Sequence, residues 1–166
     1  MQPGTDRRLD RGARTRSRLV AEARTLFAAE GYANVSGERV LIAAGVTRGA
    51  LYHHFADKQA LFEAVFEATC ADVAARTLAG ADAPNAVEGL LAGCIAFLRA
   101  CAEPGITRIY LIDGLSVLGF ARWWEIDLHH ALGALRQGVE GACAERGMTE
   151  PRLVDGLFTL LSGALN

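Results

Sequence analysis

The run AGVTRGALYHHF, residues 44–55, decides the fold at the N-terminal end of this 166-residue chain. Gly45 stands where two short helices would join, because glycine accepts the positive φ of a tight turn without a Cβ penalty. Ser36 is a typical N-cap for the first of these helices, and Thr47 is one for the second. Two short helices joined in this way predict a helix-turn-helix motif.

Helical patterns extend outward from this motif in both directions. Good helix formers dominate the composition, and no alternating run of β-branched residues suggests a strand. Before the motif, we expect a helix from about Arg14 to Glu30. After it, apolar spacing and capping residues predict helices over about 57–79, 85–103, 106–118 with an interruption near Gly114, 121–146, and from Pro151 onward. The predicted fold class is therefore all-α.

The formal charge of −2 conceals two parts of opposite sign. Residues 1–58 hold ten Lys and Arg against six Asp and Glu, a net of +4. Residues 59–166 hold seven against thirteen, a net of −6. We therefore predict a three-helix head over 13–58 that meets a polyanion, and a helical body over 59–166.

The second helix of the motif carries residues suited to reading DNA. A small first turn at Gly49 and Ala50 would let this helix enter the major groove closely, while Arg48 can reach a guanine edge or a phosphate. Tyr52 and His53 would lie on the exposed side of the helix, within reach of the DNA backbone. The alternative is an ordinary solvated helix face with one packed aromatic residue.

Further cations flank the motif. Lys58, in the first turn of the following helix, adds a positive charge where the helix dipole already favours phosphate. Arginines stand at positions 7, 8, 11, 14, 16 and 18. They form either a solvated tail or an arm that follows the phosphate backbone or enters the minor groove. In the second case Arg14 and Arg18, nearest the first helix, are the expected contacts.

Aromatic residues of the body allow two interpretations. A ligand pocket would place Phe97, Cys101, Tyr110 and Trp123 around an apolar small molecule, with Arg108, Asp113 or His129 supplying polarity. Packing in the core and at an interface is the alternative. His129 has no second ligand at a suitable spacing, so no metal site is predicted.

Several classes of protein lack their signatures here. GxSxG, HExxH, P-loop and dinucleotide motifs are all absent, so an enzyme is not expected. The cysteines at 70, 94, 101 and 143 form no CxxC pair and are most simply core thiols in a reducing cytoplasm, with a redox-sensing pair at 94 and 101 as the alternative. No apolar run approaches the roughly 20 residues of a membrane span, and the arginine-rich start is no secretory signal. We therefore expect a cytoplasmic protein.

Three stretches resemble the TetR family of repressors. Residues 18–32, RLVAEARTLFAAEGY, resemble the family's first helix, residues 44–55 its turn and recognition helix, and residues 57–62, DKQALF, the start of its fourth helix. The resemblance is dense over about 13–73. Beyond that it is looser, although residues 122–127 and 160–166 still look like body segments of one branch of the family.

The resemblance implies a ligand-responsive homodimer, and no cofactor is expected. Its two heads would bind a palindromic operator in double-stranded DNA and block transcription, and a small molecule entering the body would spread the heads. Residues matching Thr47, Tyr52 and Lys58 hold phosphates in the family, and those matching Arg48, Gly49 and His53 lie at base edges. The DNA-binding candidates are therefore Arg14, Arg18, Ser36, Thr47, Arg48, Gly49, Ala50, Tyr52, His53 and Lys58.

Two departures from the family pattern leave alternatives open. The family usually has a small residue where Leu41 stands, close to the facing helix, which leaves room for a helical ligand-binding protein whose head no longer reads DNA. Family members also run longer, with two C-terminal helices in the dimer's four-helix bundle. Here the first is cut short and the second is missing, so we expect a truncation. Activation of transcription in place of repression also stays open.

Overall fold

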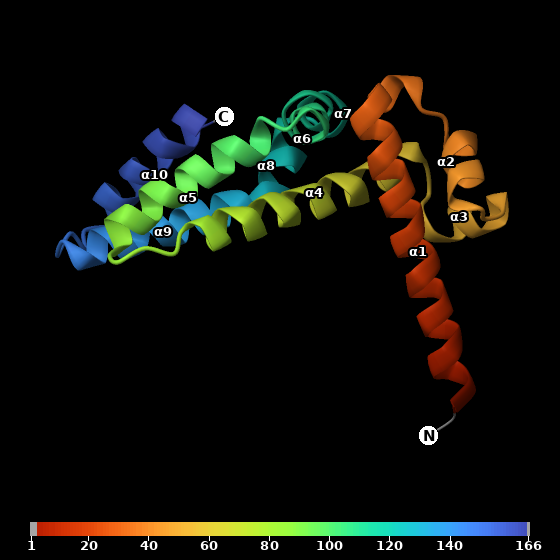
Figure 1. Ribbon diagram of the computed structural model, residues 1–166, viewed down its shortest axis with the longest axis horizontal. Coiled ribbons are helices and arrows are strands. Elements are labelled where there is room, and N and C mark those ends of the chain that lie inside the picture. The colour runs from red at the N-terminus through yellow and green to blue at the C-terminus, as the bar shows by residue number, and fades with distance from the viewer. Residues whose placement is uncertain (1–2, 166) are drawn as a thin grey trace. The chain divides into compact units, whose positions relative to one another are not determined.

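A computed structural model describes residues 3–165, and Figure 1 shows the helices that they form. No strand occurs within residues 3–165, so the predicted all-α fold class is confirmed. The chain divides into two compact units, Met1–Phe66 and Glu67–Asn166, which we call unit 1 and unit 2.

Unit 1 contains the predicted helix-turn-helix. In chain order it comprises α1 (Pro3–Glu30), the short 3-10 helix η1 (Tyr32–Asn34), α2 (Gly37–Ala44), α3 (Arg48–His54) and the start of α4 (Lys58–Gly80). The helix expected to begin near Arg14 begins instead at Pro3. Residues 5–11 hold neither Gly nor Pro, so nothing there breaks the helix.

An apolar core holds the motif together in unit 1. Its buried members include Leu19, Ala23, Phe27, Val40, Leu51, Phe55 and Phe62. The three from α1 are spaced by four residues and so share one helix face. At the surface, the Arg39 guanidinium donates hydrogen bonds of 2.5 and 2.7 Å to the two carboxylate oxygens of Glu30, which joins α2 to the end of α1.

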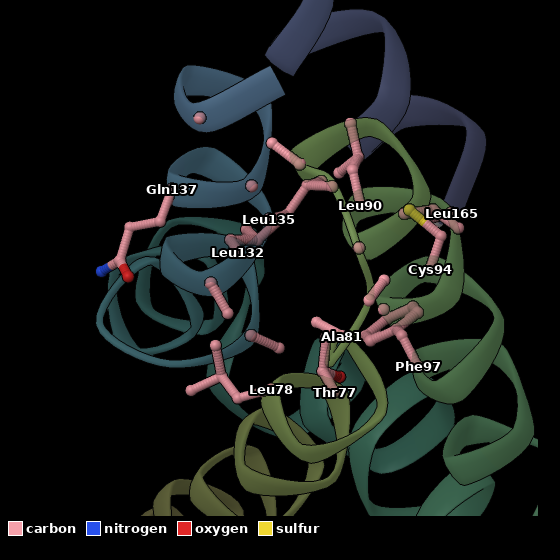
Figure 2. Close-up of a pocket in the computed structure, with 18 of the residues that line it drawn as sticks. Thr77, Leu78, Ala81, Leu90, Cys94, Phe97, Leu132, Leu135, Gln137 and Leu165 are labelled. Atoms are coloured by element: carbon pink, nitrogen blue, oxygen red, sulfur yellow. The ribbon is translucent and has the colours of Figure 1, made fainter. Parts of the chain in front are cut away.

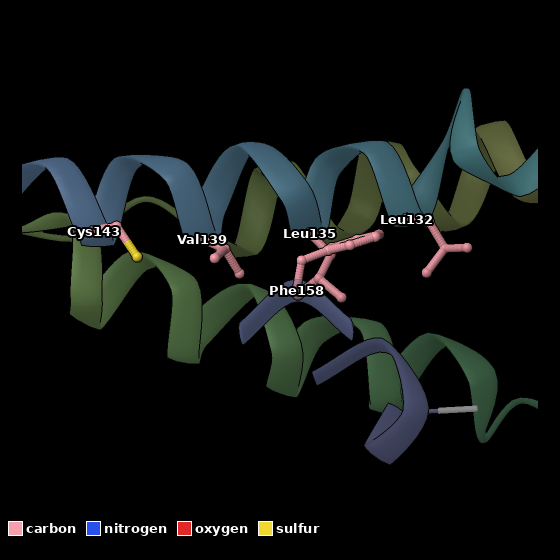
Figure 3. Close-up of a cluster of buried hydrophobic side chains, with 5 residues drawn as sticks. All are labelled: Leu132, Leu135, Val139, Cys143 and Phe158. Carbon is pink, nitrogen blue, oxygen red and sulfur yellow. The ribbon is translucent and has the colours of Figure 1, made fainter. Parts of the chain in front are cut away.

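Unit 2 is dominated by three helices that lie side by side (Figure 1): α5 (Ala86–Cys101), α9 (Ala131–Glu145) and α10 (Pro151–Leu165). Figure 3 shows Leu132, Leu135, Val139 and Cys143 in a row along one side of α9, with Phe158 of α10 beside Leu135; together they form a buried apolar cluster. These α9 positions follow the three-to-four spacing of an apolar helix stripe. Between α5 and α9 the chain forms α6 (Pro104–Ile106), η2 (Thr107–Asp113), α7 (Gly114–Leu118) and α8 (Phe120–Leu128).

The interruption expected near Gly114 is wrong. Gly114 has helical dihedral angles, φ −54° and ψ −53°, and residues 104–118 are helical without a break. The irregularity is instead η2, a π-helix, in which wider turns replace the ordinary hydrogen-bond pattern. The helical run ends at Gly119, which has φ 75°.

The single helix expected over 121–146 is also wrong, because the chain bends between Leu128 and Ala131. His130 leaves the helical region with φ −128° and ψ −107°. The bend is tight: a Cβ built on Gly133 would lie 2.5 Å from the carbonyl oxygen of Leu128. Glycine at this position therefore allows α9 to begin directly against the end of α8.

Two further properties concern residues 3–165 alone. No helix in that range is both long and apolar enough to cross a membrane. No three of its His, Cys, Asp and Glu side chains are grouped so that they could hold a metal ion. The four cysteines are free; Cys70, Cys101 and Cys143 are buried and Cys94 is half-buried. Burial raises the pKa of the Cys101 thiol to about 12, which keeps it protonated.

Candidate functional site

The turn of the helix-turn-helix is closed by its own backbone. Gly45 adopts a left-handed conformation, φ 59° and ψ 40°, and its N–H donates to the Ile42 carbonyl at 3.1 Å. The next N–H, of Val46, donates to the Leu41 carbonyl at 3.2 Å. The exposed Arg18 side chain of α1 lies over this turn, since a Cβ built on Gly45 would be 2.6 Å from its Nη2.

Both predicted N-caps are formed. The Ser36 hydroxyl accepts from the Arg39 N–H at 3.3 Å, and the Thr47 hydroxyl accepts from the Ala50 N–H at 3.3 Å. A hydroxyl that accepts one bond still has its own hydrogen to donate. Both residues are exposed, so either hydroxyl is available to a phosphate oxygen.

α3 has one buried apolar side and one exposed polar side. Leu51 is buried against α2, where a Cβ on Gly37 would lie 3.7 Å from its Cδ2. The remaining candidates on this helix are turned outward or half-exposed: Arg48, Gly49, Ala50, Tyr52 and His53. The Arg48 guanidinium lies 5.5 Å from the centre of the Tyr52 ring, a cation–π contact between residues four apart.

Gly49 stands in open space. A Cβ built on it would meet no atom within 4 Å, and its φ is outside the left-handed region. No contact among residues 3–165 therefore requires glycine here.

Lys58 is placed differently from a free surface cation. Its ammonium donates to the carbonyl oxygens of Tyr32 at 3.0 Å and Val35 at 3.1 Å, and lies 4.0 Å from the centre of the Tyr32 ring. Three donors are available on a lysine, so these two bonds leave one for another acceptor. Lys58 thus joins the start of α4 to the connection between α1 and α2.

Gly12 and Arg16 of α1 lie close to the end of α3. A Cβ on Gly12 would lie 3.9 Å from Cε1 of His54, and the Arg16 guanidinium lies 5.2 Å from the centre of the Phe55 ring. Arg14 and Arg18 are both exposed. The structure thus places the α1 candidates and the α3 candidates within one unit.

Unit 2 contains a cavity of about 520 Å³ among the end of α4, the connection to α5, α5 itself and α9 (Figure 2). Small residues line much of it, including Ala81, Gly89 and Gly93 on one side and Ala134 and Gly138 on the other. Larger apolar side chains complete the wall: Leu78, Leu90, Phe97, Leu132, Leu135 and Leu165. Its volume lies in the range of roughly 300–1,000 Å³ typical of small-molecule sites.

Of the seven residues predicted to surround a ligand, Phe97 lines this cavity and the other six do not. Cys101, Tyr110 and Trp123 are buried as packing residues, whereas Arg108 and His129 are exposed and Asp113 is half-buried elsewhere. The physical reason is that the aromatic residues satisfy one another. The Trp123 indole N–H donates to the Tyr110 carbonyl at 3.0 Å, and the two rings meet edge to face with centres 5.7 Å apart.

The sequence does contain a pattern that marks the cavity wall, namely regularly spaced small residues on α5 and α9. Gly89 and Gly93 are four apart on α5, and Ala134, Gly138 and Gly141 are spaced by four and three on α9. Such spacing places small side chains on one face of each helix. A Cβ on Gly89 would lie 2.8 Å from the Ala81 carbonyl oxygen, and one on Gly138 would lie 3.0 Å from Cδ1 of Leu90, so these glycines allow close packing at the cavity wall.

A helix-turn-helix with an exposed second helix, followed by a separate helical unit with a cavity, defines the class of helix-turn-helix regulators. The profile described as "Bacterial regulatory proteins, tetR family" matches residues 19–65, and that described as "Tetracyclin repressor-like, C-terminal domain" matches residues 87–166. A solved TetR-family transcriptional regulator from Pectobacterium atrosepticum is 35% identical, over 94% of this chain and 80% of that chain, with a TM-score of 0.78. The chain therefore belongs to the TetR family of transcriptional regulators, and it is not an enzyme.

Curated relatives match about a third of this chain. The HTH-type transcriptional repressor AcnR of Corynebacterium efficiens is 39% identical over 56 residues, which are 34% of this chain and 30% of that protein. The HTH-type transcriptional regulator AcrR of Shigella flexneri is 43% identical over 53 residues, which are 32% of this chain and 25% of that protein. The matched segment thus spans less than a third of the length of either relative.

Proposed function

We propose that the chain is a DNA-binding repressor that binds a palindromic operator as a homodimer and leaves it when a small molecule occupies unit 2. The single observation that carries the DNA-binding part is the exposed polar side of α3. Its candidates face outward while Leu51 anchors the helix from behind. A helix held in this way can enter a major groove with its side chains free to reach base edges.

The chemistry of each candidate side chain suggests which part of the DNA it contacts. Arg48 offers a bidentate donor suited to a guanine edge. Ser36 and Thr47 each offer a hydroxyl hydrogen, and Arg14 and Arg18 offer cations, to phosphates. Gly49 supports close approach, since no contact within the described residues accounts for the missing side chain.

The geometry of the turn at Gly45 favours a head that binds DNA over one that no longer reads it. Leu41, the departure from the family pattern, is half-buried, and its carbonyl takes part in closing the turn. Gly45 keeps the left-handed conformation that a helix-turn-helix requires. The larger side chain is therefore accommodated without distortion of the motif.

A homodimer would present two copies of α3 to one duplex. Two-fold symmetry then calls for two half-sites whose centres lie about 34–36 Å apart or at a multiple of that distance. The relative AcnR is named a transcriptional repressor, which supports repression of transcription in place of activation. The cavity of unit 2 supplies a place for the effector, away from the candidates of unit 1 in the sequence.

Footprinting tests this function directly. The protein is incubated with the DNA upstream of its own coding sequence, and protection from hydroxyl-radical cleavage is mapped with the wild type and with Arg48→Ala. We expect two protected half-sites with the spacing given above, which the variant loses at equal concentration. Protection that is absent, or unchanged by the substitution, would contradict DNA reading by α3.

A further inference from the structure

The cavity of unit 2 is surrounded by neutral side chains. Among the lining residues that the structure describes, none is Asp, Glu, Lys, Arg or His. The one ionisable side chain in this described lining is the thiol of Cys94, and burial raises the pKa of that thiol, so it stays uncharged. A charged ligand group inside would lose its hydration without gaining a partner of opposite charge.

Two of the polar side chains at the wall make hydrogen bonds within the protein, and a third points elsewhere. Thr77 donates its hydroxyl hydrogen to the Val73 carbonyl at 2.8 Å. The Asn85 side chain accepts from the Glu88 N–H at 2.9 Å and donates to the Glu88 carboxylate at 2.9 Å. Figure 2 shows the Gln137 amide directed away from the hollow. Few directional hydrogen bonds are therefore on offer to a polar ligand.

The lining favours a compact apolar ligand. Small Gly and Ala residues of α5 and α9 line the cavity together with Phe97 and several leucines, so most of the surface that they offer is apolar. A compact hydrocarbon skeleton can contact such a surface closely.

We infer that the effector of this regulator is an uncharged, largely apolar molecule that binds between α5 and α9. This inference rests on the proposed function for the word effector, but the choice of ligand class rests on the cavity alone. Affinity would come from the removal of apolar surface from water, because neither an ion pair nor a metal contributes.

Three molecules with one skeleton test the ligand class: biphenyl-4-ylmethanol, biphenyl-4-carboxylate and biphenyl-4-ylmethylammonium. Each is titrated against the protein carrying Nile red, a neutral dye whose fluorescence rises in apolar surroundings. We expect the alcohol to displace the dye at concentrations about tenfold or more below those needed for either ion. Equal displacement by the carboxylate or the ammonium compound would overturn the inference, as would the absence of displacement by all three.

A blocked cavity locates the binding. Ala134→Phe places a large side chain on the α9 wall, whereas Ala144→Phe adds the same side chain at an exposed position of α9 outside the cavity. Binding of the alcohol should be lost in the first variant and kept in the second. Equal binding by both variants would place the molecule elsewhere and overturn the inference.

Operator release is measured separately, by adding the alcohol to the protein–DNA complex. If the alcohol binds the cavity and the complex stays intact, the ligand class holds and the effector role in the proposed function fails. If the alcohol does not bind while the protein still protects its operator, the ligand class fails and DNA binding holds.

Discussion

The hydroxyl of Tyr110 donates a 2.6 Å hydrogen bond to Oδ2 of Asp127 in the interior of unit 2. Asp127 is fully buried, and this burial raises the pKa of its carboxyl group to about 6, although the Tyr110 bond acts in the opposite direction. The thiols of Cys70 in α4 and Cys101 in α5 face this carboxyl group. Burial raises the pKa of both thiols, so they stay protonated and uncharged. The carboxyl group is thus neutral below about pH 6.

This pKa predicts how stability depends on pH. An unfolded aspartate titrates near pH 4, so between about pH 4 and 6 the folded state binds the additional proton. The contribution of Asp127 to the free energy of unfolding should therefore fall as pH rises through that window, by on the order of 2–3 kcal/mol. Urea unfolding of the wild type and of Asp127→Asn at several pH values measures it as the difference between the two proteins. Parallel curves would show that the carboxyl titrates alike in both states.

Gly49 predicts opposite changes in stability and DNA binding. Alanine is a better helix former than glycine, and its Cβ would meet nothing within 4 Å. Gly49→Ala should therefore raise the free energy of unfolding by up to about 1 kcal/mol. If α3 lies close in the groove, the same methyl group should weaken operator binding severalfold. Gly156→Ala, an equally open position in α10, should stabilise without affecting DNA; equal DNA affinity in both variants would contradict close approach at Gly49.

Lys58 should contribute to folding as well as to DNA binding. Lys58→Met removes two hydrogen bonds to carbonyls and the contact with the Tyr32 ring. We expect a loss of about 1–3 kcal/mol in the free energy of unfolding and weaker binding to operator and random DNA alike. Arg152→Met, which removes one exposed charge from unit 2, serves as the control for net charge. A variant with unchanged thermal stability would argue against the carbonyl contacts.

The left-handed turn at Gly45 offers a matched pair of substitutions. Gly45→Ala and Gly147→Ala both place a Cβ at positive φ, 59° and 71° respectively. Each should cost about 1–2 kcal/mol of stability. Only Gly45→Ala should weaken operator binding, because its Cβ also displaces Arg18 and strains the turn that holds α3. Equal loss of DNA affinity in both variants would indicate a general effect of instability.

The sequence was most informative where one residue type meets a local requirement. Gly45, Thr47 and Ser36 predict the turn and both caps, because backbone conformation and capping depend on a few neighbouring residues. The bend before Ala131 was not predictable from periodicity, since Leu128, Leu132 and Leu135 keep helical spacing across it. Only the close approach of Gly133 to the Leu128 carbonyl, a contact visible in three dimensions, explains it.

Pocket residues were harder to predict than the helix that would face DNA. Trp123 and Tyr110 were predicted to line a pocket because their aromatic side chains are large. Both instead fill the interior, where the Trp123 indole N–H donates a hydrogen bond to the Tyr110 carbonyl. The cavity is lined by small residues such as Gly93 and Ala134. Which small residues line a cavity becomes apparent only once the helices that face each other are known. Lys58 is a similar case, since its carbonyl partners precede it by more than twenty residues.

Salt-dependent titration of the operator is the most direct test of DNA reading by α3. Fluorescence anisotropy would measure the dissociation constant for the footprinted operator and for a scrambled duplex at several salt concentrations, with the wild type and Arg48→Ala. The proposed function predicts that affinity falls steeply with salt for both duplexes. It also predicts that Arg48→Ala loses about 1–3 kcal/mol on the operator and much less on the scrambled duplex. An operator affinity that is insensitive to salt, or equal losses on the two duplexes, would contradict it.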